Sequence, residues 1–125
     1  MKKKVLVTLH DPGPTNALSS VLSVLTRENN IETIVLSESD SSRKVLDSKK
    51  IPYTTLKEGN KLENLEPTCI ESLVKHVGPD LILTGISVQS NLDRYFINAA
   101  KQNKRPSAAI FEGYTYSTVR KKDSE

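Results

Sequence analysis

The residues best suited to chemistry lie in one short stretch near the N-terminus. His10 and Asp11 directly follow the apolar run 5–9 and precede Pro12-Gly13-Pro14. An imidazole and a carboxylate can act as a general base and the group that orients it. Adjacent side chains of a strand point to opposite faces, so we do not expect His10 and Asp11 to pair directly. The alternative is that this stretch only shapes a tight turn, with Asp11 as a helix cap and His10 in a structural role.

The same stretch also has the position of a ligand-binding loop, between a buried strand and a helix. A helix N-terminus attracts anions, but this loop is neither GxGxxG nor a P-loop. Pro12 and Pro14 have no backbone N–H to donate, and Asp11 adds negative charge where a phosphate would lie. We therefore expect it to contact the hydroxyls of a sugar-like ligand, through His10, Asp11, Gly13, Thr15 and Asn16.

Two further groups of candidate ligand-binding residues follow later apolar runs. After the run 81–84, Gly85 permits a close backbone approach, and neutral hydrogen-bonding side chains follow it, namely Ser87, Gln89 and Ser90. Arg94 can reach an anion or a partner surface, whereas Ser90 can equally be a plain helix cap with Asp93 as its partner. After the run 107–111, Glu112 and Tyr114 suit ligand contact, or Tyr114 covers the edge of the core.

The elements that must position these groups alternate along the chain. Apolar or β-branched runs predict five strands, at 5–9, 31–36, 51–56, 81–84 and 107–111, with helices between most of them. Thr15 or Asn16 is expected to cap the first helix, and Pro52 suits an edge strand. We predict an α/β fold with a doubly wound, parallel, five-stranded, Rossmann-like sheet of order 3-2-1-4-5. In that order the loops after the first and fourth strands share a crevice, where ligands of open α/β sheets bind.

Length and composition predict a single domain, placed at 1–116, with a charged tail at 117–125 that is disordered or truncated. The net charge of +3 comes from basic clusters at the two ends, Lys2–Lys4 and Arg120–Lys122, which argues against a nucleic-acid partner. No apolar run is long enough for a membrane span or a signal peptide, so we expect a cytoplasmic protein.

No metal and no cofactor are expected from the residue types. Cys69 is the single cysteine, which excludes an internal disulfide, and we expect it to be partly buried. His10 and His76 are far apart in sequence, with no CxxC or HxxH motif beside them, so a zinc site is unsupported.

Three segments together resemble a known superfamily. They are Lys4–Val7 with Asp11-Pro12-Gly13, then the "PDLILTG" run at 79–85, then Ala99-Ala100 leading to Arg105-Pro106-Ser107. This pattern is similar to the N-terminal half of two-domain GT-B glycosyltransferases and the related UDP-N-acetylglucosamine 2-epimerases, over Lys4 to about Tyr114. The resemblance implies a sugar or nucleotide-sugar ligand, acceptor-binding or base residues at His10 and Asp11, and a cleft lined by Gly85–Ser90.

The chain departs from this superfamily because it has no counterpart of the C-terminal domain that mostly holds the nucleotide-sugar donor. Three alternatives follow: a fragment, a subunit that pairs with a donor-binding partner domain or subunit, or a domain that has lost catalysis. A competing hypothesis is a non-catalytic Rossmann-like ligand-binding or protein-interaction module, such as a homodimer.

Overall fold

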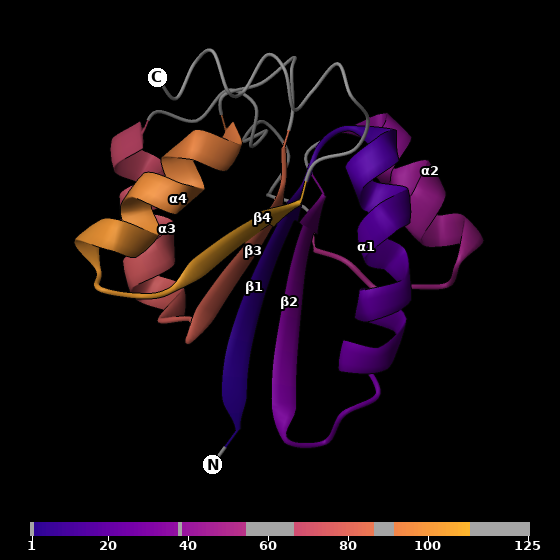
Figure 1. The fold of residues 1–125 in the computed structure, drawn as a ribbon, viewed down its shortest axis with the longest axis horizontal. Helices are drawn as coiled ribbons and strands as arrows, with labels where there is room; N and C mark the ends of the chain where they lie inside the picture. The colour runs from indigo at the N-terminus through magenta and orange to yellow at the C-terminus, as the bar shows by residue number, and fades with distance from the viewer. Residues whose placement is uncertain (1, 38, 55–66, 87–91, 111–125) are drawn as a thin grey trace.

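Strands and helices alternate along most of the chain (Figure 1). The structure is a computed structural model that describes residues 2–37, 39–54, 67–86 and 92–110. The predicted tail at 117–125 lies outside these residues. The elements, in chain order, are β1 (Lys3–Leu9), α1 (Pro12–Leu25), β2 (Ile31–Ser37), α2 (Asp40–Ser48), α3 (Pro67–Val77), β3 (Leu81–Gly85), α4 (Leu92–Gln102) and β4 (Ser107–Ile110).

The strands form a parallel sheet in the order β2-β1-β3-β4. Val5 is the register partner of Leu81, so β1 and β3 lie side by side and run the same way. This confirms the predicted parallel α/β fold and the neighbouring positions of these two strands. The turns that follow β1 and β3 therefore emerge at the same edge of the sheet, which we call the carboxyl edge.

The prediction of five strands is wrong for the described residues, which contain a sheet of four. The expected strand at 51–56 is reduced to one parallel bridge between Thr54 and Leu36 of β2, the position that the predicted order assigned to it. Thr54 donates its N–H to the carbonyl of Val35 at 2.7 Å. In a parallel ladder the next N–H donor to β2 would be two residues before Thr54, at position 52. That residue is Pro52, which has no N–H, so the ladder cannot extend toward the N-terminus. Residues 55 and 56 lie outside the described part of the chain.

Helices cover both faces of the sheet, with α1 and α2 on one side and α3 and α4 on the other (Figure 1). Successive residues of β1 point to opposite faces of the sheet. Leu6 packs in the core cluster under α3 and α4, and Val5 and Val7 pack in the core cluster under α1 and α2. This arrangement explains why β1 reads as a continuous apolar run, because both of its faces are buried.

At the opposite end of the sheet, where the strands begin and which we call the amino edge, Asp80 links β1 to the start of β3. Its carboxylate accepts the backbone N–H of Lys4 at 2.8 Å, and its own N–H donates to the carbonyl of Lys4 at 2.7 Å. The hydrogen bond from Lys4 lowers the pKa of Asp80, and the nearby charges of Lys3 and Arg105 lower it further. Gly78, directly after the end of α3, has φ of +62°, a conformation that favours glycine. These contacts set the register of β3 against β1.

Two smaller expectations concern Cys69 and the membrane. Cys69 is exposed on α3, which corrects the expected partial burial, because the apolar stripe of that helix passes through Ile70 and Val74 instead. Among the described residues, no helix is both long and apolar enough to span a membrane.

Candidate functional site

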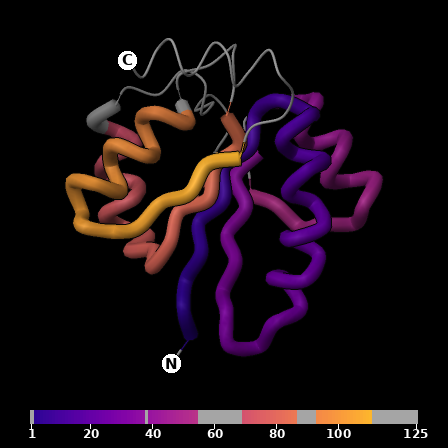
Figure 2. Tube along the Cα trace, viewed as in Figure 1, coloured from indigo at the N-terminus to yellow at the C-terminus, as the bar shows by residue number. Residues whose placement is uncertain are grey.

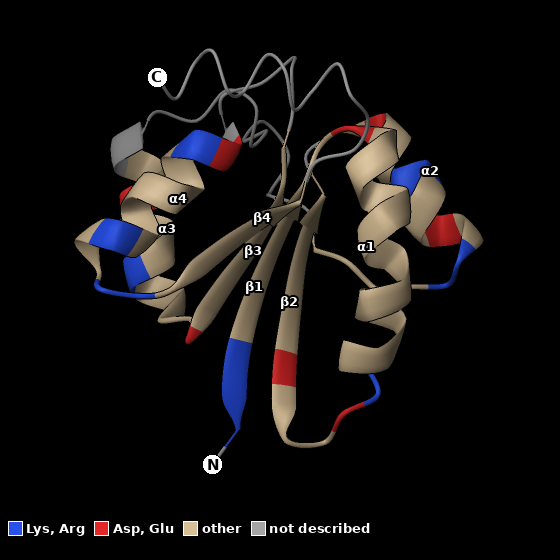
Figure 3. Ribbon diagram, in the orientation of Figure 1, with Lys and Arg blue, Asp and Glu red and all other residues tan. Residues whose placement is uncertain are grey.

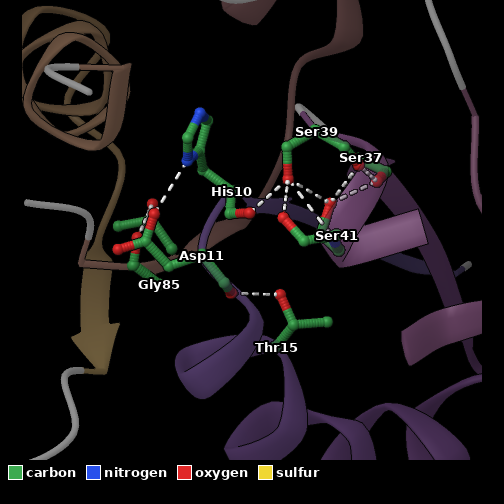
Figure 4. A network of polar contacts seen from close by, with 9 residues as sticks. His10, Asp11, Thr15, Ser37, Ser39, Ser41 and Gly85 are labelled. Atoms are coloured by element: carbon green, nitrogen blue, oxygen red, sulfur yellow. Dashed lines mark hydrogen bonds and ion pairs between the residues drawn. The ribbon is translucent and has the colours of Figure 1, made fainter. Parts of the chain in front are cut away.

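The site is centred on the turn between β1 and α1, at the carboxyl edge of the sheet. His10 Nδ1 lies 2.8 Å from Asp11 Oδ1, with 14% of the His10 side chain and 6% of the Asp11 side chain exposed (Figure 4). The expectation that the two side chains would not pair is therefore wrong. The alternation of side chains holds only within a strand, and β1 ends at Leu9, one residue before the pair.

Helix α1 begins earlier than predicted. Asp11 occupies the N-cap position with extended backbone, φ −79° and ψ 146°, but its side chain makes no capping hydrogen bond. The prediction that Thr15 or Asn16 caps the helix is wrong, since both lie within it. Thr15 instead donates its hydroxyl to the carbonyl of Asp11 at 2.7 Å. The Asp11 carboxylate is thus oriented toward His10 rather than engaged by the helix that it precedes.

The first turn of α1 is poor in the groups that bind phosphate. Pro12 and Pro14 lie in that turn, and neither has a backbone N–H. The N–H of Thr15 donates to the carbonyl of Asp11 at 3.3 Å. Gly13 is therefore the one residue among the first three of the helix that has an N–H. Sites that bind a diphosphate use several free N–H groups, so the expectation that this loop does not bind one stays a prediction.

Gly85 brings the end of β3 against the start of α1. A Cβ at Gly85 would lie 2.7 Å from the Cβ of Pro14, closer than real side chains approach. We expected Gly85 to permit close approach to a ligand; in the structure, the group that needs the space is Pro14. This contact joins the turn after β1 to the end of β3, as the predicted strand order required.

A buried hydroxyl pair connects the same two strands just below the turn. Thr8 of β1 donates to the hydroxyl of Thr84 of β3 at 2.8 Å, and both residues are buried. Two polar groups taken out of water satisfy each other here, so the pair holds the strand ends in register without leaving an unpaired hydroxyl.

Sequence reasoning missed the serine cluster of the neighbouring turn, between β2 and α2. Ser39 is the N-cap of α2 and accepts the backbone N–H of Ser42 at 3.2 Å. Its hydroxyl also donates to the backbone carbonyl of His10 (Figure 4). The signal for this contact was present in the sequence: β2 borders β1 in the predicted order, so the turns after these strands had to be neighbours. Figure 2 shows both turns at one end of the sheet.

The remaining predicted site residues fall into two groups. At the carboxyl edge, Arg94 is exposed in the first turn of α4, beside the buried Asp93, and Asn16 is exposed on α1. The others lie outside the described residues, so their predicted roles stay predictions: Ser87, Gln89, Ser90, Glu112 and Tyr114.

Charge is unevenly placed around the sheet. The basic residues at the start of β1, Lys3 and Lys4, lie at the amino edge, away from the His10–Asp11 turn (Figure 3).

Within the described ranges, no three His, Cys, Asp or Glu residues lie close enough together to hold a metal ion. The turn after β1 offers the His10 imidazole and the Asp11 carboxylate, and Ser39 adds a hydroxyl from the neighbouring turn.

Comparison with known proteins identifies the fold. No protein-family model matches the chain, and no curated protein matches it. Among solved structures, the UDP-GlcNAc 2-epimerase of Neisseria meningitidis bound to UDP-GlcNAc matches with a TM-score of 0.63 and 21% identity, over 86% of this chain and 32% of that one. Another UDP-N-acetylglucosamine 2-epimerase matches with a TM-score of 0.67 and 17% identity, over 88% of this chain and 33% of that one. Staphylococcus aureus MnaA, solved with UDP, matches with a TM-score of 0.66 and 19% identity, over 86% of this chain and 29% of that one.

The matches with the two epimerases define the chain as a Rossmann-like α/β domain with the fold found in part of the UDP-N-acetylglucosamine 2-epimerases. The resemblance read from the sequence is confirmed at the level of the fold. The chain spans about a third of the length of these epimerases.

Proposed function

We propose that this chain is a GT-B-like domain that acts in sugar or nucleotide-sugar chemistry and is incomplete alone. The observation that carries the proposal is the His10–Asp11 pair, which lies at the start of α1 where β1 and β3 end side by side. The fold shared with UDP-N-acetylglucosamine 2-epimerases supports the same class of ligand.

In the proposed chemistry, His10 is the proton-transfer group and Asp11 orients it. With Nδ1 donating to the Asp11 carboxylate, the lone pair of the neutral ring is on Nε2. Figure 4 shows that this second nitrogen points away from Asp11. Nε2 would accept a proton from a hydroxyl of the bound sugar, and the carboxylate would stabilise the imidazolium that forms.

The chemistry of the turn favours a neutral, hydroxylated part of the ligand over its phosphates. The prolines at the start of α1 reduce the supply of N–H donors, and the nearly buried Asp11 carboxylate would repel a diphosphate. A carboxylate accepts hydrogen bonds from sugar hydroxyls well. We therefore place the sugar, or the acceptor of a transfer reaction, beside His10, Asp11 and Gly13.

A partner domain or subunit is proposed to hold the nucleotide. The matched region is about a third of each epimerase chain, and the Neisseria meningitidis epimerase was solved bound to UDP-GlcNAc. The domain described here would supply the His10–Asp11 pair, and its partner would supply the phosphate-binding groups.

Calorimetric titration of the chain with N-acetylglucosamine, UDP and UDP-GlcNAc tests this proposal. We expect weak binding of the sugar-containing ligands, lost in Asp11→Asn, and no binding of UDP. Asp40→Asn, which changes an exposed carboxylate on α2, is the matched control and should bind as the unmodified chain does. Submicromolar binding of UDP would contradict the placement of the nucleotide on a partner.

A second candidate function is a protein-interaction module. Two large apolar side chains one helical turn apart on α1 are exposed, Val21 at 43% and Val24 at 59%. Sedimentation analysis tests this alternative: a stable dimer that Val24→Lys dissociates would favour it, and a monomer at high concentration would exclude self-association.

A further inference from the structure

We propose that Ser39 is a positioning residue for the His10–Asp11 pair, acting from the neighbouring helix. Its hydroxyl, at the N-cap of α2, donates to the backbone carbonyl of His10. The assignment of a catalytic purpose to this contact rests on the proposed function of the pair. The inference that Ser39 sets how the two side chains meet does not depend on that function.

The peptide unit between His10 and Asp11 is the link between Ser39 and the pair. The carbonyl of His10 and the N–H of Asp11 belong to one planar group, so a hydrogen bond to that oxygen fixes the orientation of the whole plane. The orientation of this plane sets the directions of the side chains on either side of it. Thr15 holds the next carbonyl, that of Asp11, at 2.7 Å. Two hydroxyls from two helices therefore hold consecutive peptide groups around the pair.

Ser39 serves both helix α2 and the β1–α1 turn with a single hydroxyl. The oxygen accepts the N–H of Ser42 at 3.2 Å, and the carbonyl of His10 is a nearer acceptor for its proton than the Ser42 hydroxyl at 3.3 Å. Threonine at this position would keep both bonds. Glycine would keep an acceptable N-cap but lose the proton donor, since glycine at an N-cap costs little helix stability.

The surrounding serines provide a control that does not touch His10. Ser42 is fully buried, lies 2.5 Å from the hydroxyl of Ser37, and donates to the carbonyl of Ser39 at 2.9 Å. Removing the Ser42 hydroxyl disturbs the same turn and takes away the competing acceptor that lies 3.3 Å from the Ser39 hydroxyl. It leaves the Ser39–His10 hydrogen bond in place.

The test is NMR of the full chain with ¹⁵N-labelled histidine. The chain has two histidines, and the exposed His76 on α3 serves as the internal reference. In the unmodified chain we expect a slowly exchanging Nδ1–H signal from His10. In Ser39→Ala and Ser39→Gly, this proton should exchange with solvent about fivefold faster or more, as expected for a weakened hydrogen bond. Ser39→Thr should restore the slow exchange, and Ser42→Ala should leave it unchanged.

Three results would overturn the inference. The first is that the His10 Nδ1–H of folded Ser39→Gly exchanges with solvent as slowly as in the unmodified chain. The second is that Ser42→Ala speeds this exchange as much as the Ser39 variants do. The third is failure of Ser39→Thr to restore the signal. None of these measurements uses a sugar, so they are separate from the test of function. If the signal responds to Ser39 but the chain binds no sugar, the proposed function fails and the positioning role remains.

Discussion

Gly85, the last residue of β3, lies so close to Pro14 of α1 that a Cβ at position 85 would come within 2.7 Å of the Pro14 Cβ. The two residues are 71 positions apart in sequence, yet their contact closes the turn that carries His10 and Asp11. The geometry of the candidate site therefore requires a residue without a side chain at position 85.

Replacing Gly85 by alanine is expected to destabilise the fold by about 1–3 kcal/mol, the usual range for overpacking, because the new methyl group would push α1 away from β3. Chemical denaturation measures the change. Pro14→Gly removes the opposing Cβ, so Gly85→Ala should cost clearly less in that background. An equal cost in both backgrounds would show that the contact with Pro14 is not the cause.

The Thr8–Thr84 hydrogen bond gives a second stability test. Replacing either threonine by valine leaves the other hydroxyl buried without its partner, and each change should cost about 1–3 kcal/mol of unfolding free energy. The double replacement removes both hydroxyls together and should cost much less than the sum of the single changes. Additive costs in the double-mutant cycle would contradict a direct coupling between the two side chains.

The Asp80 carboxylate predicts a pH dependence of stability. The hydrogen bond from the Lys4 N–H lowers the pKa of Asp80 in the folded state below its ordinary value of 3.8. The stabilisation is therefore present above that ordinary value and is lost as the pH falls through the folded-state pKa. Urea unfolding at a series of pH values should show the unmodified chain more stable than Asp80→Asn at pH 6, with the difference shrinking below about pH 4. A difference that stays constant down to pH 2 would exclude this role.

Asp11→Asn separates a catalytic role from a capping role. Asp11 makes no side-chain capping bond, and asparagine keeps its size, so the free energy of unfolding should change little. In a complete enzyme that contains this domain, the loss of the carboxylate that orients His10 should lower kcat by about 100-fold or more. Unfolding of the variant would favour the alternative in which Asp11 serves the turn alone.

The sequence predicted the parts of the fold that depend on local pattern. The apolar runs at β1 and β3 predicted buried strands that lie side by side and run parallel. The strand at 51–56 was overpredicted because one proline, Pro52, removes the donor that the ladder would need next.

The site was predicted as a location, but its internal contacts were not. The pairing of His10 with Asp11 depends on where β1 ends, and an error of one residue there reverses the expected side-chain direction. The contact of Ser39 with the His10 carbonyl joins two turns 29 residues apart. The predicted strand order makes these two turns neighbours, but it does not specify which atoms of the turns meet, because that depends on the packing of the adjacent strands.

Chemical-shift mapping of the ¹⁵N-labelled chain with N-acetylglucosamine is the most direct test of the central claim, that the His10–Asp11 turn binds a sugar. The account predicts shifts that saturate with ligand at His10, Asp11, Gly13 and Gly85, and that disappear in Asp11→Asn. Saturable shifts confined to other parts of the sheet, or no shifts with any sugar or UDP-sugar, would contradict it.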